Sequence, residues 1–488
     1  MGINIKGVLN VLGALLIGLG SFMFLVLLFC FFFDADDRIT FLQSGSLTIS
    51  VGAITWWLSR HASKKIGKRE GYLIVGLGWL TISIFSCLPY LFSATMENFT
   101  DAFFESVSGL TTTGASIIND LETTPKGILL WRSLTQWFGG MGIIVLTVAL
   151  FPLLGIGGVE LFIAESPGPT SDKIHPRIKE TAKRLWFIYV GLTALLTITL
   201  FLVGMTFFDA INHALTTLSS GGFSTKNESV AFYDIPVIQY IIAFFMFLTG
   251  INYTLIYYGL KGRFNKVWKS DEFKAYLFVM ISLIIVVTSA VYYLNDSHFE
   301  QAFRDSTFQV ISIVTTTGFV TADYTSWSPT LTFLFFLLLF IGACAGSTSG
   351  GIKIIRHLVF LKNSILEFKR LLHPRGVIRT KIDEKVVAPR ILTHILVFLI
   401  LYLLIFMVGS SVMTFILRDF EQPFLSSIGA VATSLGNVGP GIGHLGPLNN
   451  FAGVPAAGKW FLSLLMIIGR LELFTILILF TPYFWRAN

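Results

Sequence analysis

The sequence predicts an all-α polytopic membrane protein in which four similar helix–loop–helix units surround a central axis. Three observations carry this prediction. First, 54% of the 488 residues are hydrophobic and only 13% are charged, whereas a soluble globular chain has about 25% charged residues. Second, several apolar runs can cross a hydrocarbon core of about 30 Å as helices of about 20 residues. Third, a polar motif that contains glycine returns between these runs, as TTTG at 111–114 and at 315–318.

Ten membrane crossings are expected from the apolar runs. The first run, 8–33, is too long for the apolar part of a secretory signal, and no Ala-x-Ala cleavage site follows it. We therefore expect it to remain in the protein as a helix. The expected crossings are 8–33, 39–59, 71–92, 127–152, 185–208, 236–260, 275–294, 329–362, 390–417 and 455–482.

The basic residues predict the orientation of these crossings. With the N-terminus in the cytoplasm, the loops on the cytoplasmic side carry the basic stretches 60–70, 261–270 and 353–390 and most of the 35 Lys and Arg residues. Cytoplasmic loops of membrane proteins are enriched in Lys and Arg. We therefore predict that both the N-terminus and the C-terminus are cytoplasmic.

The loops after the third, fifth, seventh and ninth crossings resemble one another. They read FTDAFFESVSGLTTTGAS (99–116), FFDAINHALTTLSSGGFST (207–225), FRDSTFQVISIVTTTGFVT (303–321) and FEQPFLSSIGAVATSLGNVGPG (420–441). In the first three, a Phe precedes a Gly by the same interval: Phe99 and Gly114, Phe207 and Gly222, Phe303 and Gly318. In the fourth loop, Gly436 comes one residue later than the interval predicts, and Gly439 is a weaker candidate.

These loops divide the chain into an N-terminal helix pair and four repeats. Each repeat has an even number of crossings, so all four repeats point the same way and can surround an axis along the membrane normal. The predicted units are the helix pair 1–70, repeat 1 at 71–160, repeat 2 at 161–262, repeat 3 at 263–375 with a broken second helix, and repeat 4 at 376–488.

The repeated loops have the chemistry of a cation site. A cation that loses its water needs a ring of oxygen ligands, and four converging extended stretches can supply backbone carbonyls, as the filter loops of potassium channels do. Glycine permits the positive φ that turns successive carbonyls toward one axis. A single Thr/Gly-rich stretch is also compatible with an ordinary turn. The candidate ligand residues are Thr111, Thr112, Thr113, Gly114, Ser219, Ser220, Gly221, Gly222, Thr315, Thr316, Thr317, Gly318, Thr433, Ser434, Leu435 and Gly436.

With these four loops, the chain resembles the Trk/Ktr/HKT superfamily of potassium transporters, most closely its bacterial TrkH/TrkG branch. The resemblance implies four M1–P-loop–M2 repeats with pseudo-fourfold symmetry around a central pore, and a homodimer in the bacterial inner membrane. It also implies a cytosolic nucleotide-binding regulatory partner of the TrkA type. In this superfamily a Ser at the first-loop glycine goes with sodium transport, so Gly114 favours K⁺ as the transported ion.

Two features of the second helices stand out. Residues 331–363 would span about 50 Å as one helix, and the centre of this run reads GACAGSTSGG at 342–351. A kink or close helix packing would also explain these small residues.

Arg470 lies near the middle of the last crossing, where a charge is costly. Hydrogen bonds to backbone carbonyls or to a neighbouring helix would also stabilise its guanidinium there. The resemblance implies a gate below the filter, made by Gly342, Ala345, Gly346, Ser347, Gly350, Gly351 and Arg470.

The sequence therefore favours potassium uptake through a gated conduit. The alternative is a secondary transporter that couples K⁺ to H⁺ or Na⁺, although the parallel repeats do not favour it. No nucleophile–base pair or metal-ligand spacing predicts an enzyme. We expect lipid as the surroundings of the chain, no nucleic-acid partner, and no organic cofactor besides the transported K⁺.

Overall fold

The computed structural model describes residues 3–33, 35–62, 67–145, 174–294 and 298–486. Helices make up nearly all of the regular structure in these residues, with a single two-stranded hairpin of β1 (Lys381–Ile382) and β2 (Lys385–Val386). The expected end of the fourth crossing at 152 and the expected boundary between repeats 1 and 2 at 160 lie outside the described residues. The fold is that of an all-α polytopic membrane protein, as the sequence predicts.

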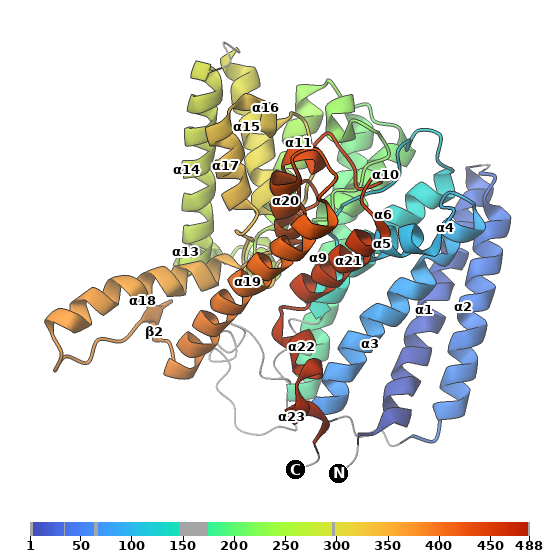
Figure 1. The fold of residues 1–488 in the computed structure, drawn as a ribbon, viewed down its shortest axis with the longest axis horizontal. Helices are drawn as coiled ribbons and strands as arrows, with labels where there is room; N and C mark the ends of the chain where they lie inside the picture. Colours follow the sequence, from blue (N-terminus) through green and yellow to red (C-terminus); the bar gives the residue numbers. More distant parts are fainter. Residues whose placement is uncertain (1–2, 34, 63–66, 146–173, 295–297, 487–488) are drawn as a thin grey trace.

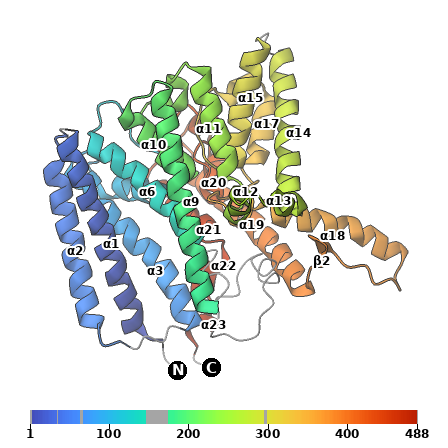
Figure 2. The same ribbon diagram turned by 180° about the vertical axis from the view of Figure 1, so that it is seen from behind.

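The two N-terminal helices stand at one edge of the molecule (Figures 1 and 2). The first helix, α1 (Ile5–Phe32), packs along α2 (Arg38–Ser59). Glycines make this close approach possible, since a Cβ on Gly13 would lie 2.8 Å from the carbonyl oxygen of Gly52. Small residues at helix contacts let two backbones approach closely inside a membrane.

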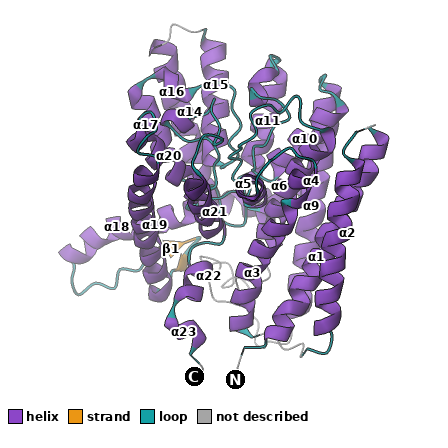
Figure 3. Ribbon diagram, turned by 45° about the vertical axis from the view of Figure 1, so that its right-hand side comes forward, coloured by secondary structure: helices purple, strands orange, loops and turns teal. Residues whose placement is uncertain are grey.

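After these two helices, the described residues repeat one order of elements four times: a long helix, a short helix, a loop and a second helix. The loops run among the helices of the bundle (teal in Figure 3). The first unit has α3 (Lys68–Ser86), α4 (Leu88–Phe92), α5 (Phe99–Leu110) and α6 (Lys126–Val145). The second has α9 (Ile174–Leu202), α10 (Phe207–Leu218), η3 (Ser229–Phe232), α11 (Pro236–Thr249) and α12 (Tyr253–Leu260). The third has α13 (Phe264–Lys269), α14 (Asp271–Leu294), α15 (Phe299–Val314), α16 (Tyr324–Trp327), α17 (Pro329–Leu338) and α18 (Ile354–Leu372). The fourth has α19 (Pro389–Ile416), α20 (Pro423–Gly436), η4 (Gly443–Leu445), α21 (Ala456–Arg470), α22 (Phe474–Leu477), η5 (Ile478–Phe480) and α23 (Pro482–Trp485).

Side-chain caps start two of the short helices where the sequence repeats its Phe-x-Asp pattern. The side chain of Asn98 accepts a hydrogen bond from the backbone N–H of Asp101, and Thr206 accepts one from Asp209. Such N-caps satisfy backbone donors that have no partner inside the helix, and an acidic residue in the first turn suits the helix dipole.

The described residues contain fewer uninterrupted spans than the ten expected crossings. Five helical segments are long and apolar enough to cross a membrane: Ile5–Phe32, Lys68–Phe92, Glu180–Leu202, Asp271–Leu294 and Pro389–Ile416. Two more crossings are broken, because α11 and α12 meet at 107° and α21 meets the following turns at 110°. The remaining three expected crossings correspond to α2, which is rich in polar residues, to α6, and to the short α17.

The two breaks correct the expectation of continuous crossings at 236–260 and 455–482. At the first break, Asn252 starts a new helix by accepting a hydrogen bond of 2.8 Å from the backbone N–H of Thr254. At the second, Glu472 and Leu473 both adopt a positive φ, 57° and 54°, which ends an α-helix. The second helices of three repeats are therefore interrupted, and not that of repeat 3 alone.

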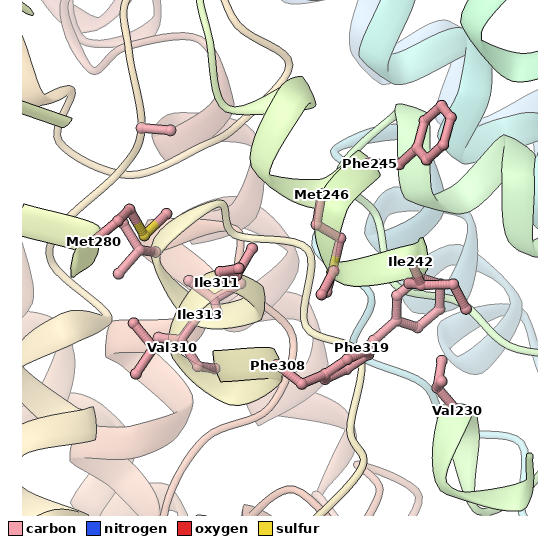
Figure 4. Close-up of a cluster of buried hydrophobic side chains, with 14 of the residues drawn as sticks. Val230, Ile242, Phe245, Met246, Met280, Phe308, Val310, Ile311, Ile313 and Phe319 are labelled. Carbon is pink, nitrogen blue, oxygen red and sulfur yellow. The ribbon is translucent and has the colours of Figure 1, made fainter. Parts of the chain in front are cut away.

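Two large hydrophobic clusters surround the loops. One joins repeats 2 and 3 and includes Ile242 and Met246 of α11, Phe308 of α15, and Phe319 directly after the third loop (Figure 4). The other joins the N-terminal helices to repeats 1 and 4. The helix α18 leaves the bundle sideways and carries the β-hairpin at its base, while α1 begins and α23 ends at the same end of the molecule (Figure 1). The loops are thus held in the middle of the bundle by apolar packing on all sides.

Candidate functional site

The four short helices end in the same backbone conformation. Directly after each short helix, or one residue later, the backbone takes a left-handed φ: 53° at Thr112, 56° at Ser220, 56° at Thr316 and 53° at Asn437. Two residues later a glycine has a positive φ: 82° at Gly114, 77° at Gly222, 79° at Gly318 and 105° at Gly439. We call the segments 111–114, 219–222, 315–318 and 436–439 stretches 1 to 4.

A matching hydrogen bond aligns the four stretches with one another. The N–H of the third residue donates to a carbonyl five residues earlier, from Thr113 to Ser108 (2.9 Å) and from Gly221 to Thr216 (2.9 Å). The same bond runs from Thr317 to Ser312 (2.8 Å) and from Val438 to Thr433 (3.0 Å). This pattern closes the end of a helix before the chain turns away.

The fourth stretch therefore differs in register from the sequence expectation. Thr433, Ser434, Leu435 and Gly436 form the last turn of α20. The positive φ values of Asn437 and Gly439 align stretch 4 with the others at 436–439. Asn is among the few residues that tolerate the left-handed conformation, which allows Asn437 to take the place of Thr112. A sequence signal was available, since Phe424 precedes Gly439 by the interval that separates Phe99 from Gly114.

The glycines close the four stretches into a ring. A Cβ added to Gly114 would overlap the carbonyl oxygen of Gly221, and the same applies to Gly222 and Thr317, and to Gly318 and Val438. A Cβ on Gly439 would lie 2.7 Å from the carbonyl oxygen of Thr113. Each stretch thus packs on the next in chain order, the fourth packs on the first, and only glycine fits at these four contacts.

A second ring of hydrogen bonds, two of them made by side chains, joins the loops beyond the glycines. The N–H of Leu121 donates to Asn227 Oδ1 (2.8 Å), which joins loops 1 and 2. The other junctions are Ala231 N to Val320 O (3.0 Å), Tyr324 Oη to Gly441 O (2.6 Å) and Phe451 N to Ser116 O (2.8 Å). The amide of Asn227 also donates to Asp120 and lowers the pKa of that carboxyl below its usual value. The loops are therefore joined all the way round on both levels.

A buried ion pair supports loops 1 and 2 from behind. Arg132 Nε of α6 lies 2.8 Å from Glu105 Oε1 of α5, and both side chains are almost fully buried. Glu105 accepts hydrogen bonds from Ser116 Oγ (3.0 Å) and from the N–H of Ile117 (2.9 Å). Arg132 also donates to the carbonyl of Ser224 (3.2 Å). This pair was not predicted from the sequence. An acidic residue in one apolar segment and a basic residue in the next would have pointed to it.

The segment 342–351 passes directly beside the stretches. Its Gly350 N–H donates to Thr316 Oγ1 (2.6 Å), and Thr348 Oγ1 lies 2.8 Å from Ser220 Oγ. A Cβ on Gly350 would lie 2.5 Å from the carbonyl oxygen of Gly436. The segment therefore touches stretches 2, 3 and 4.

The other residues expected in this segment hold its shape. The N–H of Gly342 donates to the carbonyl of Ile352 (2.9 Å), so the two ends of the segment lie side by side. Gly346 and Gly351 have φ values of 72° and 65°. Ser347 Oγ donates to the carbonyl of Cys344 (2.6 Å), and the N–H of Ala345 donates to Glu272 (2.6 Å) at the start of α14.

The side chain of Arg470 connects segment 342–351 with α6. It is buried, and it donates to the carbonyls of Thr348 (2.9 Å) and Gly139 (3.2 Å). Its place in repeat 4 matches that of Gly140 in repeat 1, because the preceding glycines, Gly469 and Gly139, press on the ends of α20 and α5 in the same way. In repeats 2 and 3 the matching residues are Gly250 and Gly350.

Two residues at the start of the basic stretch 353–390 are buried. Lys353 is buried and donates to the carbonyl of Ser349 and to Ser349 Oγ (3.1 Å). Arg356 is also buried, pairs with Glu472, and lies 4.0 Å from the ring of Phe398. Buried charges are kept where partners compensate for the lost water, and both residues have such partners.

Comparison with known proteins decides the family. The TrkH family, described as cation transport protein, matches residues 37–486. The chain belongs to the TrkH family.

Individual TrkH-family relatives cover nearly the whole chain. The Trk system potassium uptake protein TrkH of Salmonella typhimurium is 41% identical, over 99% of this chain and 100% of the relative. TrkG of Escherichia coli is 34% identical, over 93% of both. The crystal structure of the potassium transporter TrkH from Vibrio parahaemolyticus superposes with a TM-score of 0.91 at 37% identity, over 99% of this chain and 100% of that one. The predicted family and helical membrane fold are confirmed, and these relatives are named as transporters and not as enzymes.

Proposed function

We propose that this TrkH-family chain takes up K⁺ through a central pathway formed where stretches 1 to 4 meet. The closed ring of glycine contacts carries this proposal, because it brings four sets of backbone carbonyls to one place. A ring of carbonyl oxygens can replace the water around K⁺. Relatives that span the whole chain are named as potassium uptake proteins. K⁺ is then the transported ion, and no organic cofactor takes part.

The second part of the proposal is a gate made by segment 342–351 and Arg470. Arg470 is a buried cation that donates to this segment at Thr348. A fixed positive charge in a low-dielectric passage raises the energy of a passing cation far more than it would in water. Opening then requires the segment and Arg470 to move away from the pathway.

The third part concerns the assembly. We propose that the chain works as a homodimer in the bacterial inner membrane, with both termini and the basic loops in the cytoplasm. There it is regulated by a TrkA-like nucleotide-binding protein. The names of the relatives speak of a Trk system, and the basic loop residues Lys261, Arg263 and Lys266 are exposed. The four repeats and the N-terminal pair are the proposed structural units.

The test is ion flux into liposomes that hold the purified full-length protein. Tracer Rb⁺ uptake is measured against rising Na⁺, for the parent and for Gly114→Ser. The serine side chain would meet the Gly221 carbonyl at a positive φ, so we expect K⁺ selectivity or K⁺ flux to fall. Unchanged selectivity and rate would remove stretch 1 from the pathway. Flux that requires a proton or sodium gradient would identify a coupled transporter instead.

A further inference from the structure

The third residue of stretch 2 differs from the third residues of the other three stretches. Stretches 1, 3 and 4 carry Thr113, Thr317 and Val438 there, whereas stretch 2 carries Gly221. Gly221 is absent from the positions with a positive φ, so its backbone conformation does not require glycine. The reason for a glycine must lie in what surrounds it.

The side chain of Gln136 occupies the space that a side chain at Gly221 would need. A Cβ on Gly221 would overlap Cδ and Oε1 of Gln136 and would lie 2.8 Å from Nε2. The three nearest atoms all belong to this one amide. Gln136 comes from α6 of repeat 1 and is fully buried.

This amide pairs with the backbone on both sides of Gly222. Gln136 Nε2 donates to the carbonyl of Gly221 (2.6 Å), and Oε1 accepts from the N–H of Phe223 (3.0 Å). A donor and an acceptor partner together fix which way the amide faces. The Gly221 carbonyl is also the one on which Gly114 packs, so Gln136 fixes a peptide group that stretches 1 and 2 share.

No other repeat has an amide at this place. Gln136 lies four residues before Gly140; the residues four before Gly250, Gly350 and Arg470 are Met246, Gly346 and Met466. Of these, Met246 packs in the apolar cluster of repeats 2 and 3, and Met466 offers only its backbone carbonyl, to Asn437 (2.9 Å). The amide clamp therefore belongs to the junction of repeats 1 and 2 alone.

We propose that Gln136 is a positioning residue that sets ion selectivity by fixing the peptide groups of Gly221 and Phe223. This inference rests on the proposed function of the stretches. A carbonyl that is held still keeps the oxygen ring at one size, which matters when two cations differ chiefly in radius. A carbonyl without its clamp can follow a smaller ion inward, so loss of Gln136 favours Na⁺ relative to K⁺.

The first test replaces Gln136 by methionine, the residue that repeats 2 and 4 carry at this place. Gln136→Met keeps the volume and removes both hydrogen bonds, and we expect the ratio of Rb⁺ to Na⁺ flux in liposomes to fall by about fivefold to tenfold. Gln309→Met is the matched control, because Gln309 is a buried amide of α15 whose hydrogen bond among the described residues goes to a side chain, Thr321 Oγ1 (3.3 Å). The control should keep the parent ratio. A Gln136→Met ratio equal to that of the parent would overturn the inference.

The second test uses the fit of the Gln136 amide into the space beside Gly221. It compares two single variants with the double variant. Gly221→Ala alone displaces the amide, and Gln136→Ala alone removes it, so each should lower the flux ratio. Once the amide is gone, the new methyl group has room, and the double variant should be no worse than either single one. Losses that add in the double variant would contradict the clamp. Size exclusion and thermal unfolding of each variant check the fold.

Gly114→Ser in the same assay separates this inference from the proposed function. If Gly114→Ser changes the flux ratio while the Gln136 and Gly221 variants do not, the clamp is wrong and the pathway stands. If none of these variants changes the ratio, the stretches are not the selective element.

Discussion

Single residues decide how the four stretches meet. Each glycine contact admits no Cβ, and the left-handed residue before it is Thr, Ser or Asn. The side chains of Ser220, Thr316 and Asn437 make cross-links; for example, Asn437 Nδ2 donates to Thr113 Oγ1 (3.0 Å). Stretch 4 thereby reaches stretch 1 by its side chain as well as by its backbone.

The register of stretch 4 can be tested with two substitutions. Gly439→Ala should lower Rb⁺ flux strongly, because alanine at φ 105° is strained by about 1–3 kcal/mol and its methyl group meets Thr113. Thr433→Val should leave flux unchanged, since Thr433 Oγ1 has no hydrogen-bond partner among the described residues. The reverse pattern would return the fourth ligand set to 433–436.

Arg470 gives a second prediction at this scale. Arg470→Gly and Arg470→Ala both remove the charge, and Arg470→Gly also gives repeat 4 the glycine that the other three repeats carry at this position. Both should increase Rb⁺ flux, by about tenfold if the barrier falls by about 1.4 kcal/mol. Arg470→Lys should be intermediate, since it keeps the charge and loses the forked donor geometry.

The control for Arg470 is Arg418→Ala, which removes an exposed arginine. It should leave flux unchanged. Folded Arg470 variants whose flux equals or falls below that of the parent would leave this arginine as a structural group held by Thr348 and Gly139.

Among the elements, segment 342–351 is a loop with closed ends. The N–H of Gly342 bonds to Ile352 and the N–H of Ala343 bonds to Ser349 Oγ (3.2 Å). The flanking helices α17 and α18 are therefore already joined without the tip of the loop. This allows the tip to change while the rest of repeat 3 stays in place.

Deletion of residues within 343–349 should therefore increase flux without unfolding the protein. For a deletion that includes Thr348, the expected result is faster Rb⁺ uptake and less dependence on a cytosolic activator, because the contact with Ser220 of stretch 2 and the hydrogen bond from Arg470 are lost. A deletion of equal length in the 373–379 connection, away from the stretches, serves as the control. Slower uptake in a folded deletion variant would contradict a gate.

The pair of Glu105 and Arg132 holds α5 to α6. Glu105→Ala should lower the free energy of unfolding by about 3–5 kcal/mol, because it leaves a buried arginine without its partner. Replacing both residues, as Glu105→Leu with Arg132→Met, should cost less than Glu105→Ala. Thermal unfolding in detergent measures the stability of both variants. A larger loss of stability in the double variant would show that the attraction between the two charges exceeds the free energy needed to bury them.

The sequence predicts some of these elements and not others, for physical reasons. The short helices and three glycine turns follow from a repeated local pattern. The break at Leu473 is invisible in the sequence, because a leucine at φ 54° occurs inside an apolar run that favours a helix. The clamp of Gln136 on Gly221 joins residues far apart in the chain, and no local pattern marks such a pair.

At the scale of the whole molecule, the positively charged loops and the ring of stretches lie in different regions. The loop that carries Lys261 follows α12, on the far side of the break from α11. A partner bound there could move α12 without touching stretch 2, and the N–H of Tyr253 in α12 donates to the carbonyl of Gly346 (3.2 Å). This contact links the basic loop to segment 342–351.

Charge reversal of this loop tests the cytosolic partner. Lys261→Glu with Arg263→Glu and Lys266→Glu should abolish the pull-down of a soluble nucleotide-binding ring by the purified protein, because like charges then face the partner. Arg418→Glu, an exposed change at the end of α19, should leave it intact. Pull-down that survives the triple reversal would place the partner elsewhere.

A single chain that carries all four quarters of its ring has a freedom that four identical subunits lack. Gly140, Gly250 and Gly350 carry no side chain at three of the matching positions, and Arg470 places one charge at the fourth. In an assembly of four copies the same arginine would appear at every corner, and four cations would face each other in one small space. Because the quarters are joined in one polypeptide, each corner can change alone. One can be charged, one clamped by an amide and one attached to the proposed gate segment, while the ring itself keeps its size.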